Sequence, residues 1–155
     1  MSNENKKLNV AINNSLLVDE EKILSIIIQI AREKAPKVLE YPSSFSEISK
    51  DILDKMIVID KFYQRNIITK EETIQIFADL LLTDCIKKEY KDSIFLNNVK
   101  KLDELLETKY QDLLNAYNNG IIDETEYFEK FRQLINFEIN SINEIYIIDE
   151  PIKTK

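Results

Sequence analysis

Carboxylates are the side chains in this sequence with the clearest capacity for binding. The stretch from residue 103 to residue 150 holds 12 acidic and three basic residues, in a chain of 155 residues with a formal net charge of −7. An acidic surface attracts a basic surface on another molecule and sets the salt dependence of the encounter. We therefore predict a partner-binding surface formed by Asp103, Glu104, Glu107, Asp112, Asp123, Glu124, Glu126 and Glu129.

Two simpler interpretations of these carboxylates stay open. The first is a solvated acidic face that keeps the protein soluble, since helix starts attract acidic residues in any case. The second is a degenerate calcium-binding hairpin over residues 115–126, in which Gly120, Asp123 and Glu126 occupy the sixth, ninth and twelfth loop positions. The first half of that loop fits poorly, because Asn115 stands first and Tyr117 stands third. We predict no metal ligand.

Catalytic chemistry is poorly supported by the composition. The chain has no histidine, which removes the commonest general base and the commonest metal ligand. Its one cysteine, Cys85, lies in an apolar run and has no histidine to activate it. Its one glycine, Gly120, excludes a glycine-rich phosphate loop. We predict that the protein is not an enzyme and has no catalytic residue and no cofactor.

The composition also bears on nucleic acid, membrane and location. Phosphate contacts need clustered basic residues, and the lysine pairs here are short and diluted by acids, so we predict no direct nucleic-acid binding. No apolar run approaches the roughly 20 residues of a membrane span. The polar start, Met1 to Lys7, does not resemble a signal peptide. We expect a cytoplasmic protein that does not bind a membrane.

The acidic residues must be positioned by helices. One glycine and three prolines leave too few turn residues for a multi-stranded sheet. Apolar residues recur instead at steps of three and four, which is typical of amphipathic helices. We predict an all-α bundle of about five helices, made of two antiparallel hairpins around an Ile-rich central helix. The predicted helices cover residues 19–35, 45–65, 69–91, 92–118 and 123–146.

Helix boundaries follow from capping residues and breakers. Asp19 is a candidate N-cap for the first helix, which Pro36 ends. Ser44 and Thr69 each precede a glutamate at capping-box spacing. We predict a polar N-terminal arm over residues 1–18, one helical domain over residues 19–150 and a tail over residues 151–155. The acidic long hairpin lies within that domain, at about residues 92–148.

One internal repeat stands out. Residues 63–72 align with residues 117–126, 54 positions later, and an aromatic residue follows each copy in register, at Phe77 and Phe131. Both copies fall between two predicted helices, and an Ile-Ile pair precedes each candidate cap. Convergence on a favourable turn and ancient duplication of a helical hairpin both account for this repeat.

These observations favour a non-enzymatic protein-interaction module, in which the acidic hairpin docks on a protein partner with a basic surface. Its sharpest form is an inhibitor or decoy of a nucleic-acid-handling complex, acting as a nucleic-acid mimic, as a mobile element or virus would encode. The alternative is a structural or assembly subunit that self-associates through long helices, so a homo-oligomer is also possible. A decoy needs an exposed acidic face, and an assembly subunit needs an exposed apolar stripe.

Overall fold

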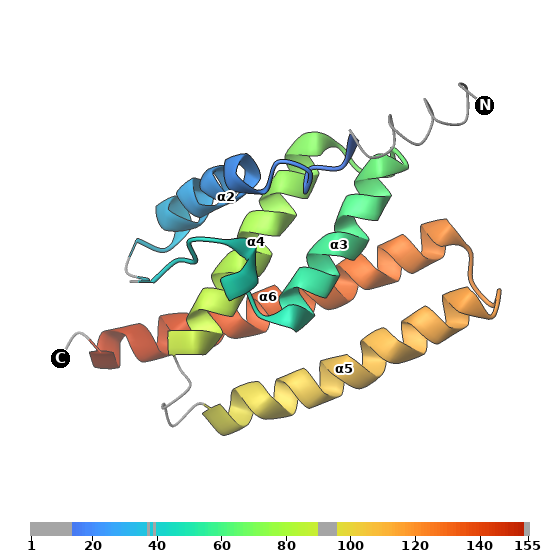
Figure 1. Cartoon of the computed structure of the whole chain (residues 1–155). Helices are drawn as coiled ribbons and strands as arrows, with labels where there is room; N and C mark the ends of the chain where they lie inside the picture. Colours follow the sequence, from blue (N-terminus) through green and yellow to red (C-terminus); the bar gives the residue numbers. More distant parts are fainter. Residues whose placement is uncertain (1–13, 37, 39, 90–95, 154–155) are drawn as a thin grey trace. The chain divides into compact units, whose positions relative to one another are not determined.

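The computed structural model describes residues 14–36, 38, 40–89 and 96–153, and these residues contain helices and no strand. Five α-helices are present in this part of the chain, with one short 3-10 helix, η1 (Phe45–Glu47), before the second of them. The α-helices are α2 (Glu20–Lys34), α3 (Lys50–Gln64), α4 (Lys70–Glu89), α5 (Leu96–Asn118) and α6 (Glu124–Lys153) (Figure 1). The predicted all-α fold is confirmed. Among the described residues, no helix is long and apolar enough to cross a membrane.

The chain divides into two compact units, Met1–Cys85 and Ile86–Lys155. The first unit contains α2, η1, α3 and most of α4, and the second contains the last residues of α4 with α5 and α6. The boundary falls inside α4, between two consecutive residues of a continuous helix. The single domain over residues 19–150 stays a prediction, since each unit is compact by itself.

In the first unit, α2 begins and ends where its capping residues predict. The Asp19 carboxylate accepts a hydrogen bond from the Lys22 backbone N–H at 3.3 Å, and Ala35 ends the helix one residue before Pro36. The face with Ile23, Leu24 and Ile27 is buried, while acidic and basic residues occupy the exposed face. The predicted Ile-rich helix therefore contributes one face to the core. The central position predicted for it is wrong, because its other side is exposed and α4 is buried more completely.

The helix predicted over residues 45–65 is broken near its start. The Glu47 carboxylate accepts a hydrogen bond from the Ser44 backbone N–H at 3.2 Å, so the predicted capping interaction forms, but it opens only the single turn of η1. Ile48 is extended, and α3 begins after Ser49. The reason is tertiary: the Ser49 N–H donates to the buried Asp84 carboxylate of α4 at 3.2 Å. A carboxylate at this position stabilises the start of α3 through the helix dipole.

The most completely buried helix is α4. Every residue from Ile76 to Ile86 is buried except Asp79, which is partly exposed. Two buried hydroxyls in α4 avoid a desolvation penalty by bonding to their own helix: Thr73 donates to the Thr69 carbonyl at 2.7 Å and Thr83 donates to the Asp79 carbonyl at 2.8 Å. Cys85 is buried, in agreement with its prediction as a small apolar residue.

Part of the predicted N-terminal arm is held by Asp60 of α3. The Ser15 hydroxyl and the Leu16 N–H donate to the Asp60 carboxylate at 2.6 and 2.9 Å, and the Gln64 amide donates to it at 2.7 Å. Asp60 is only 3% exposed, so these three donors replace the water that the carboxylate loses. The rest of the predicted arm, residues 1–13, lies outside the described residues.

The internal repeat corresponds to two turns with the same backbone. Asn66 and Gly120, which are aligned in the repeat, are the two described residues with positive φ, at 61° and 73°. At the first turn the Asn66 N–H donates to Tyr63 and the Ile67 N–H donates to Phe62; at the second turn the equivalent residues make equivalent bonds. This pair of bonds defines a Schellman motif with its left-handed residue at C′. The predicted stop at Gly120 is confirmed, and Asn66 performs the same task.

Each of these turns leads into an N-cap. The Thr69 hydroxyl accepts a hydrogen bond from the Glu72 N–H at 3.1 Å, and the Asp123 carboxylate accepts one from the Glu126 N–H at 2.8 Å. The helices that follow are α4 and α6. The end of α6 differs from our prediction, because the helix passes Tyr146 and continues through Pro151 to Lys153. Because Pro151 lies in the last turn of α6, only the end of the helix loses the hydrogen bond that its missing N–H would make.

Candidate functional site: the α5–α6 hairpin

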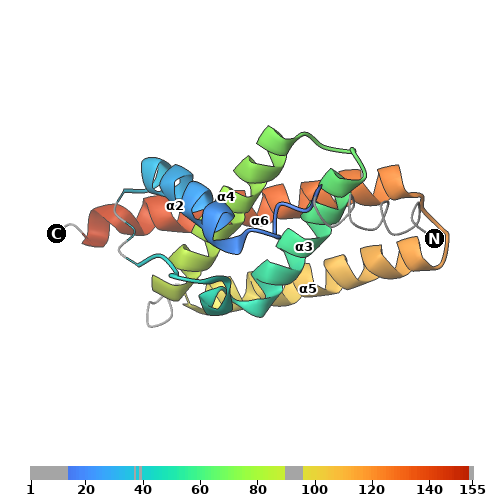
Figure 2. The ribbon, with the colours of Figure 1, turned by 45° about the horizontal axis from the view of Figure 1, so that its top comes forward.

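The second unit is built on an antiparallel pair of helices, and α5 and α6 lie side by side in both ribbon views (Figures 1 and 2). On α5 the buried apolar residues recur every seven positions, at Val99, Leu106 and Leu113. This spacing is typical of a seam between two long helices. Tyr117 stacks on Tyr127 with ring centroids 4.6 Å apart. This pair fixes the register of the two antiparallel helices. Residues that precede Tyr117 on α5 therefore lie beside residues that follow Tyr127 on α6.

A charged cluster lies in the core of this seam. Lys87, near the end of α4, donates to Glu138 and to Asp103, and both N···O distances are 2.7 Å. The Tyr110 hydroxyl donates to the other oxygen of Glu138 at 3.2 Å. The Glu138 side chain is 1% exposed and that of Lys87 is 12% exposed. Buried charges need this degree of pairing, because desolvation of an unpaired carboxylate is very unfavourable.

Electrostatics keep the Lys87 ammonium protonated. Burial by itself lowers the pKa of the Lys87 ammonium, but the combined effect of the Glu138 and Asp103 carboxylates is larger and raises the pKa above its ordinary value of 10.5. Lys87 is therefore a protonated structural cation at neutral pH. A nucleophilic or basic lysine needs the opposite shift, so this cluster stabilises the hairpin and offers no lysine chemistry.

Three of the eight predicted binding carboxylates have structural roles. Asp103 is ion-paired with Lys87, Asp123 caps α6, and Glu126 pairs with Lys130 at 3.5 Å one helical turn later. Helix starts and ion pairs thus account for part of the acidity of the hairpin. This agrees with the simpler interpretation, in which acidic residues gather at helix starts without any role in binding.

The other five carboxylates lie on different sides of the hairpin. Glu104 and Glu107 are exposed on the outer part of α5 and one turn apart, and neither is in an ion pair within the described residues. Asp112 is exposed but points elsewhere, since at about 100° per residue it lies about 140° around the helix from Glu107. Glu129 is exposed on α6, whereas Glu124 is partly buried in the first turn of α6. The eight residues do not form one continuous acidic face.

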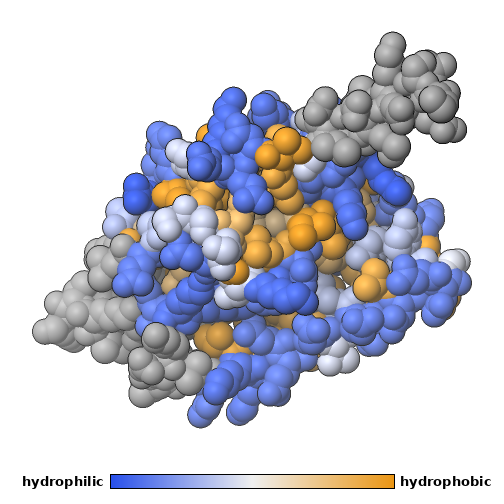
Figure 3. All heavy atoms as spheres, in the orientation of Figure 1, coloured by the Kyte–Doolittle hydropathy of each residue, from blue (hydrophilic) through white to orange (hydrophobic). Residues whose placement is uncertain are grey.

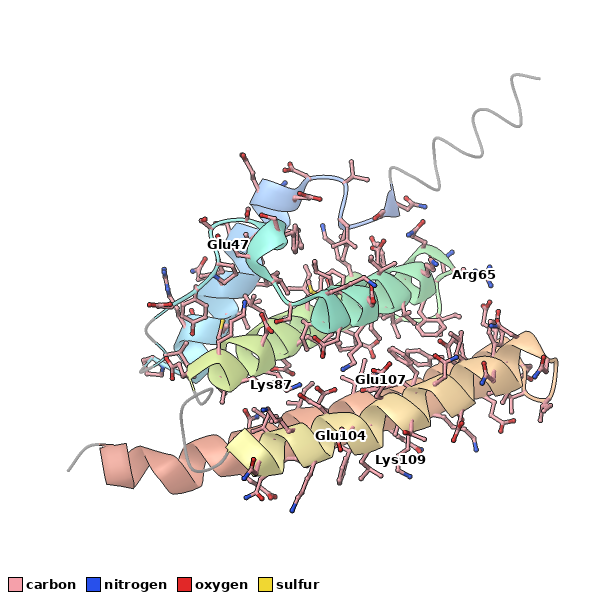
Figure 4. The ribbon with its side chains drawn as sticks, turned by 60° about the horizontal axis from the view of Figure 1, so that its bottom comes forward. Glu47, Arg65, Lys87, Glu104, Glu107 and Lys109 are labelled. Atoms are coloured by element: carbon pink, nitrogen blue, oxygen red, sulfur yellow. The ribbon has the colours of Figure 1, made fainter. Side chains whose placement is uncertain are left out.

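The pair Glu104–Glu107 is the acidic part of a hydrophilic surface. Figure 3 shows mainly hydrophilic atoms along α5, the lower helix in Figure 1. Figure 4 shows Glu107 and Lys109 at opposite edges of the same helix. The side of α5 that carries Glu107 is thus distinct from the side that carries Lys109.

The side with Lys109 contains a groove between α5 and α6, with a volume of about 490 Å³. Its lining is apolar at the base and charged at the rim, from Lys109, Asp112, Leu113, Ala116, Ile122, Lys130, Gln133 and Leu134. Leu105 and Phe137 extend this side of the hairpin and are 50% and 51% exposed. The sequence alone did not indicate this surface, although exposed apolar residues beside the α5 and α6 seams, such as Leu105 and Phe137, were a signal for it.

The segment proposed for calcium forms a helical turn. In residues 115–126, α5 continues to Asn118 and α6 begins at Glu124, so five residues separate the helices, not a twelve-residue ligand loop. The Gln111 amide donates to the Asn115 side-chain oxygen, and the Asp123 carboxylate binds a backbone N–H. Within the part of the chain that the structure describes, no three Asp, Glu, Cys or His side chains are grouped to hold a metal ion.

Comparisons with protein-family models, with curated proteins and with solved structures found no match. The charge, exposure and contacts of its own residues are what bear on the function of the hairpin. They distinguish two surfaces, the acidic pair Glu104–Glu107 and the groove with Leu105 and Phe137.

Proposed function

We propose that this chain is a non-enzymatic protein-interaction module whose α5–α6 hairpin docks through Glu104 and Glu107 on the basic surface of a protein partner. The supporting observation is that these two carboxylates are exposed and neighbouring, and make no ion pair within the described residues, while Asp103, Asp123 and Glu126 are used in folding. An uncompensated pair on a rigid helix can steer association without a large conformational cost.

The sharper form of this proposal is an inhibitor or decoy that competes with nucleic acid. A basic surface that binds phosphates attracts carboxylates by the same long-range field. The partner would then be a nucleic-acid-handling protein, and the chain itself would bind no nucleic acid.

The experiment is a pull-down from cell lysate with the tagged full chain at low salt, followed by stepwise salt elution. We expect a basic nucleic-acid-binding protein that is released at low salt steps and displaced by added DNA or RNA. Charge reversal in Glu104→Lys with Glu107→Lys should reduce its capture at least about tenfold. The matched control is Glu33→Lys with Glu40→Lys, the same charge change on exposed residues of the first unit. Equal losses in both variants would refute a docking role for the hairpin.

The alternative function, an assembly subunit, is also favoured by a specific observation. It requires exposed apolar side chains on a long helix, and Leu105 of α5 and Phe137 of α6 meet that requirement at about half exposure. Self-association through such residues should resist salt, in contrast to acidic docking.

A further inference from the structure

The groove side of the hairpin carries two rows of side chains with matched spacing. On α5 the row is Lys101, Leu105 and Asp112, four and seven residues apart; on α6 it is Lys130, Phe137 and Glu144, seven residues apart each time. At about 100° per residue, each row lies on one side of its helix. Asp112 and Lys130 both line the groove, which places the two rows on the same side of the hairpin.

The two rows also match in level and in chemistry. Counting outward from the stacked Tyr117–Tyr127 pair, Asp112 falls near the level of Lys130, and Leu105 near that of Phe137. Lys101 falls near the level of Glu144. Each charge of these six residues thus corresponds to the opposite charge on the other row, and Leu105 corresponds to Phe137. Within its own helix, Lys130 is also paired with Glu126 at 3.5 Å. All six residues are exposed.

We infer that this side of the hairpin binds the same side of a second copy of the chain, with α5 of each copy lying along α6 of the other. This inference deepens the assembly alternative and does not depend on acidic docking. A two-fold rotation about an axis parallel to α5 and α6 places the α5 row of each copy against the α6 row of the other copy. Asp112 then meets Lys130 of the second copy, and Lys130 meets Asp112, as an isologous interface requires.

Charge favours a second copy over an unrelated partner. The chain as a whole has 28 acidic and 21 basic residues, so most pairings between copies are repulsive. On the groove side the two rows contain two lysines, one aspartate and one glutamate, which balance. The apolar pair in the middle, with charges on either side, has the layout of an interface core and rim. Pairing two antiparallel helical hairpins in this way gives a four-helix bundle.

The test is the molar mass of the full chain, measured by light scattering during size-exclusion chromatography over a range of concentrations. We expect a species of twice the 18.3 kDa chain mass. Leu105→Glu and Phe137→Glu should each weaken the dimer by more than about 30-fold, because each removes two central contacts per dimer and adds like charges. Leu114→Glu is the matched control: Leu114 is 37% exposed on the other side of α5, and the change should leave the dimer intact.

A charge swap gives a second measurement that does not depend on apolar burial. Lys130→Glu alone should weaken the dimer by about tenfold, and adding Asp112→Lys should restore it, because the two rows again carry opposite charges. Circular dichroism confirms that each variant is folded.

A monomer at every concentration would overturn the inference, as would a dimer that Leu105→Glu and Phe137→Glu leave unchanged. A monomer whose groove variants lose a lysate protein would assign the groove to a different partner, which also overturns it. The Glu104→Lys, Glu107→Lys variant should remain dimeric. Its loss of lysate capture therefore tests acidic docking separately from self-association.

Discussion

Glu138 occupies a position on the seam of α6 where the pattern predicts an apolar residue. It follows Phe131 by seven residues and is fully buried, so hydrophobicity alone does not account for it. Its oxygens instead accept hydrogen bonds from Lys87 and Tyr110. A shift of α6 along α5 would leave Glu138 buried without these partners, so the cluster disfavours other registers of the two helices.

Removing Lys87 should be strongly destabilising, because it leaves Glu138 buried without its cation. We expect Lys87→Met to lower the free energy of unfolding by about 3 kcal/mol, measured by urea denaturation. Lys50→Met, in the exposed pair with Asp54, is the control and should lower it by less than about 1 kcal/mol. The double variant Lys87→Met, Glu138→Met should recover most of the loss. Equal effects of the two single variants would contradict the burial argument.

The raised pKa of Lys87 predicts a loss of stability in alkali. A group whose pKa is higher in the folded state stabilises the fold fully below its unfolded value of about 10.5 and loses that contribution as the pH rises through the folded value. Wild-type protein should therefore become less stable from about pH 10 to pH 12, measured by urea denaturation at each pH. Lys87→Arg retains the charge in this range and should flatten the decline. An unchanged slope in that variant would assign the decline to other groups.

Tyr127 is one such group. Burial, with the neighbouring Tyr117 as a second cause, raises its pKa above the ordinary value of 10.0. The sign of its contribution is the same as for Lys87, because its neutral form is favoured in the folded state. Ultraviolet titration of Tyr127→Phe should lose the tyrosine that ionises late. If the variant instead lost a tyrosine that ionises early, the raised pKa of Tyr127 would be contradicted.

At the scale of the elements, the two matching turns require the same left-handed backbone conformation from two different residues, Asn66 and Gly120. Gly120 at φ 73° has open space around the position of a side chain, so only the backbone conformation opposes substitution. Asn66 meets the same demand with one of the few side chains that tolerate it.

We therefore expect Gly120→Ala to lower the free energy of unfolding by about 1 kcal/mol, because alanine is strained at positive φ. Asn66→Gly should have no destabilising effect or a small stabilising one, since glycine adopts this conformation freely. Thermal unfolding of both variants measures the difference. A stabilising Gly120→Ala would show that the second turn does not require its left-handed residue.

Variants of Asp123 distinguish a role in helix capping from a role in partner binding. Asp123→Ala removes the acceptor for the Glu126 N–H and should lower the free energy of unfolding by about 1 kcal/mol, measured by thermal denaturation. Asp123→Asn removes the charge but keeps an acceptor, so it should have a much smaller effect. Because Asp123 has this structural role, neither variant should alter lysate capture by more than its effect on folding.

Helices and turns were predictable here because their signals are local. The N-cap Asp19, the stop at Gly120 and the seven-residue spacing of the α5 seam all lie within a few residues of what they determine. The break between η1 and α3 was not predictable, because the carboxylate that binds Ser49 belongs to Asp84, 35 positions away. For the acidic surface, the sequence predicted only the excess of acidic residues over positions 103–150. Its division among ion pair, cap and exposed face depends on which side of each helix a residue occupies.

At the scale of the whole molecule, Cys85 provides a probe of the burial of α4. It is the last residue of the first unit and is 4% exposed within α4. A thiol reagent should modify it at a small fraction of its rate in denatured protein, and the rate should increase with urea as the buried side of α4 opens. Modification of native protein at the denatured rate would contradict this burial.

The two repeated turns also bear on how the chain finds its structure during synthesis. Each joins two helices that are neighbours in sequence, so each turn forms from local encounters that close only a short loop. Topologies of this kind fold in microseconds to milliseconds, whereas translation adds only about 5–20 residues per second. The α3–α4 turn leaves the ribosome 54 residues before its counterpart. The α3–α4 turn can therefore form while the acidic hairpin is still being made, so the two turns form in the order of the sequence.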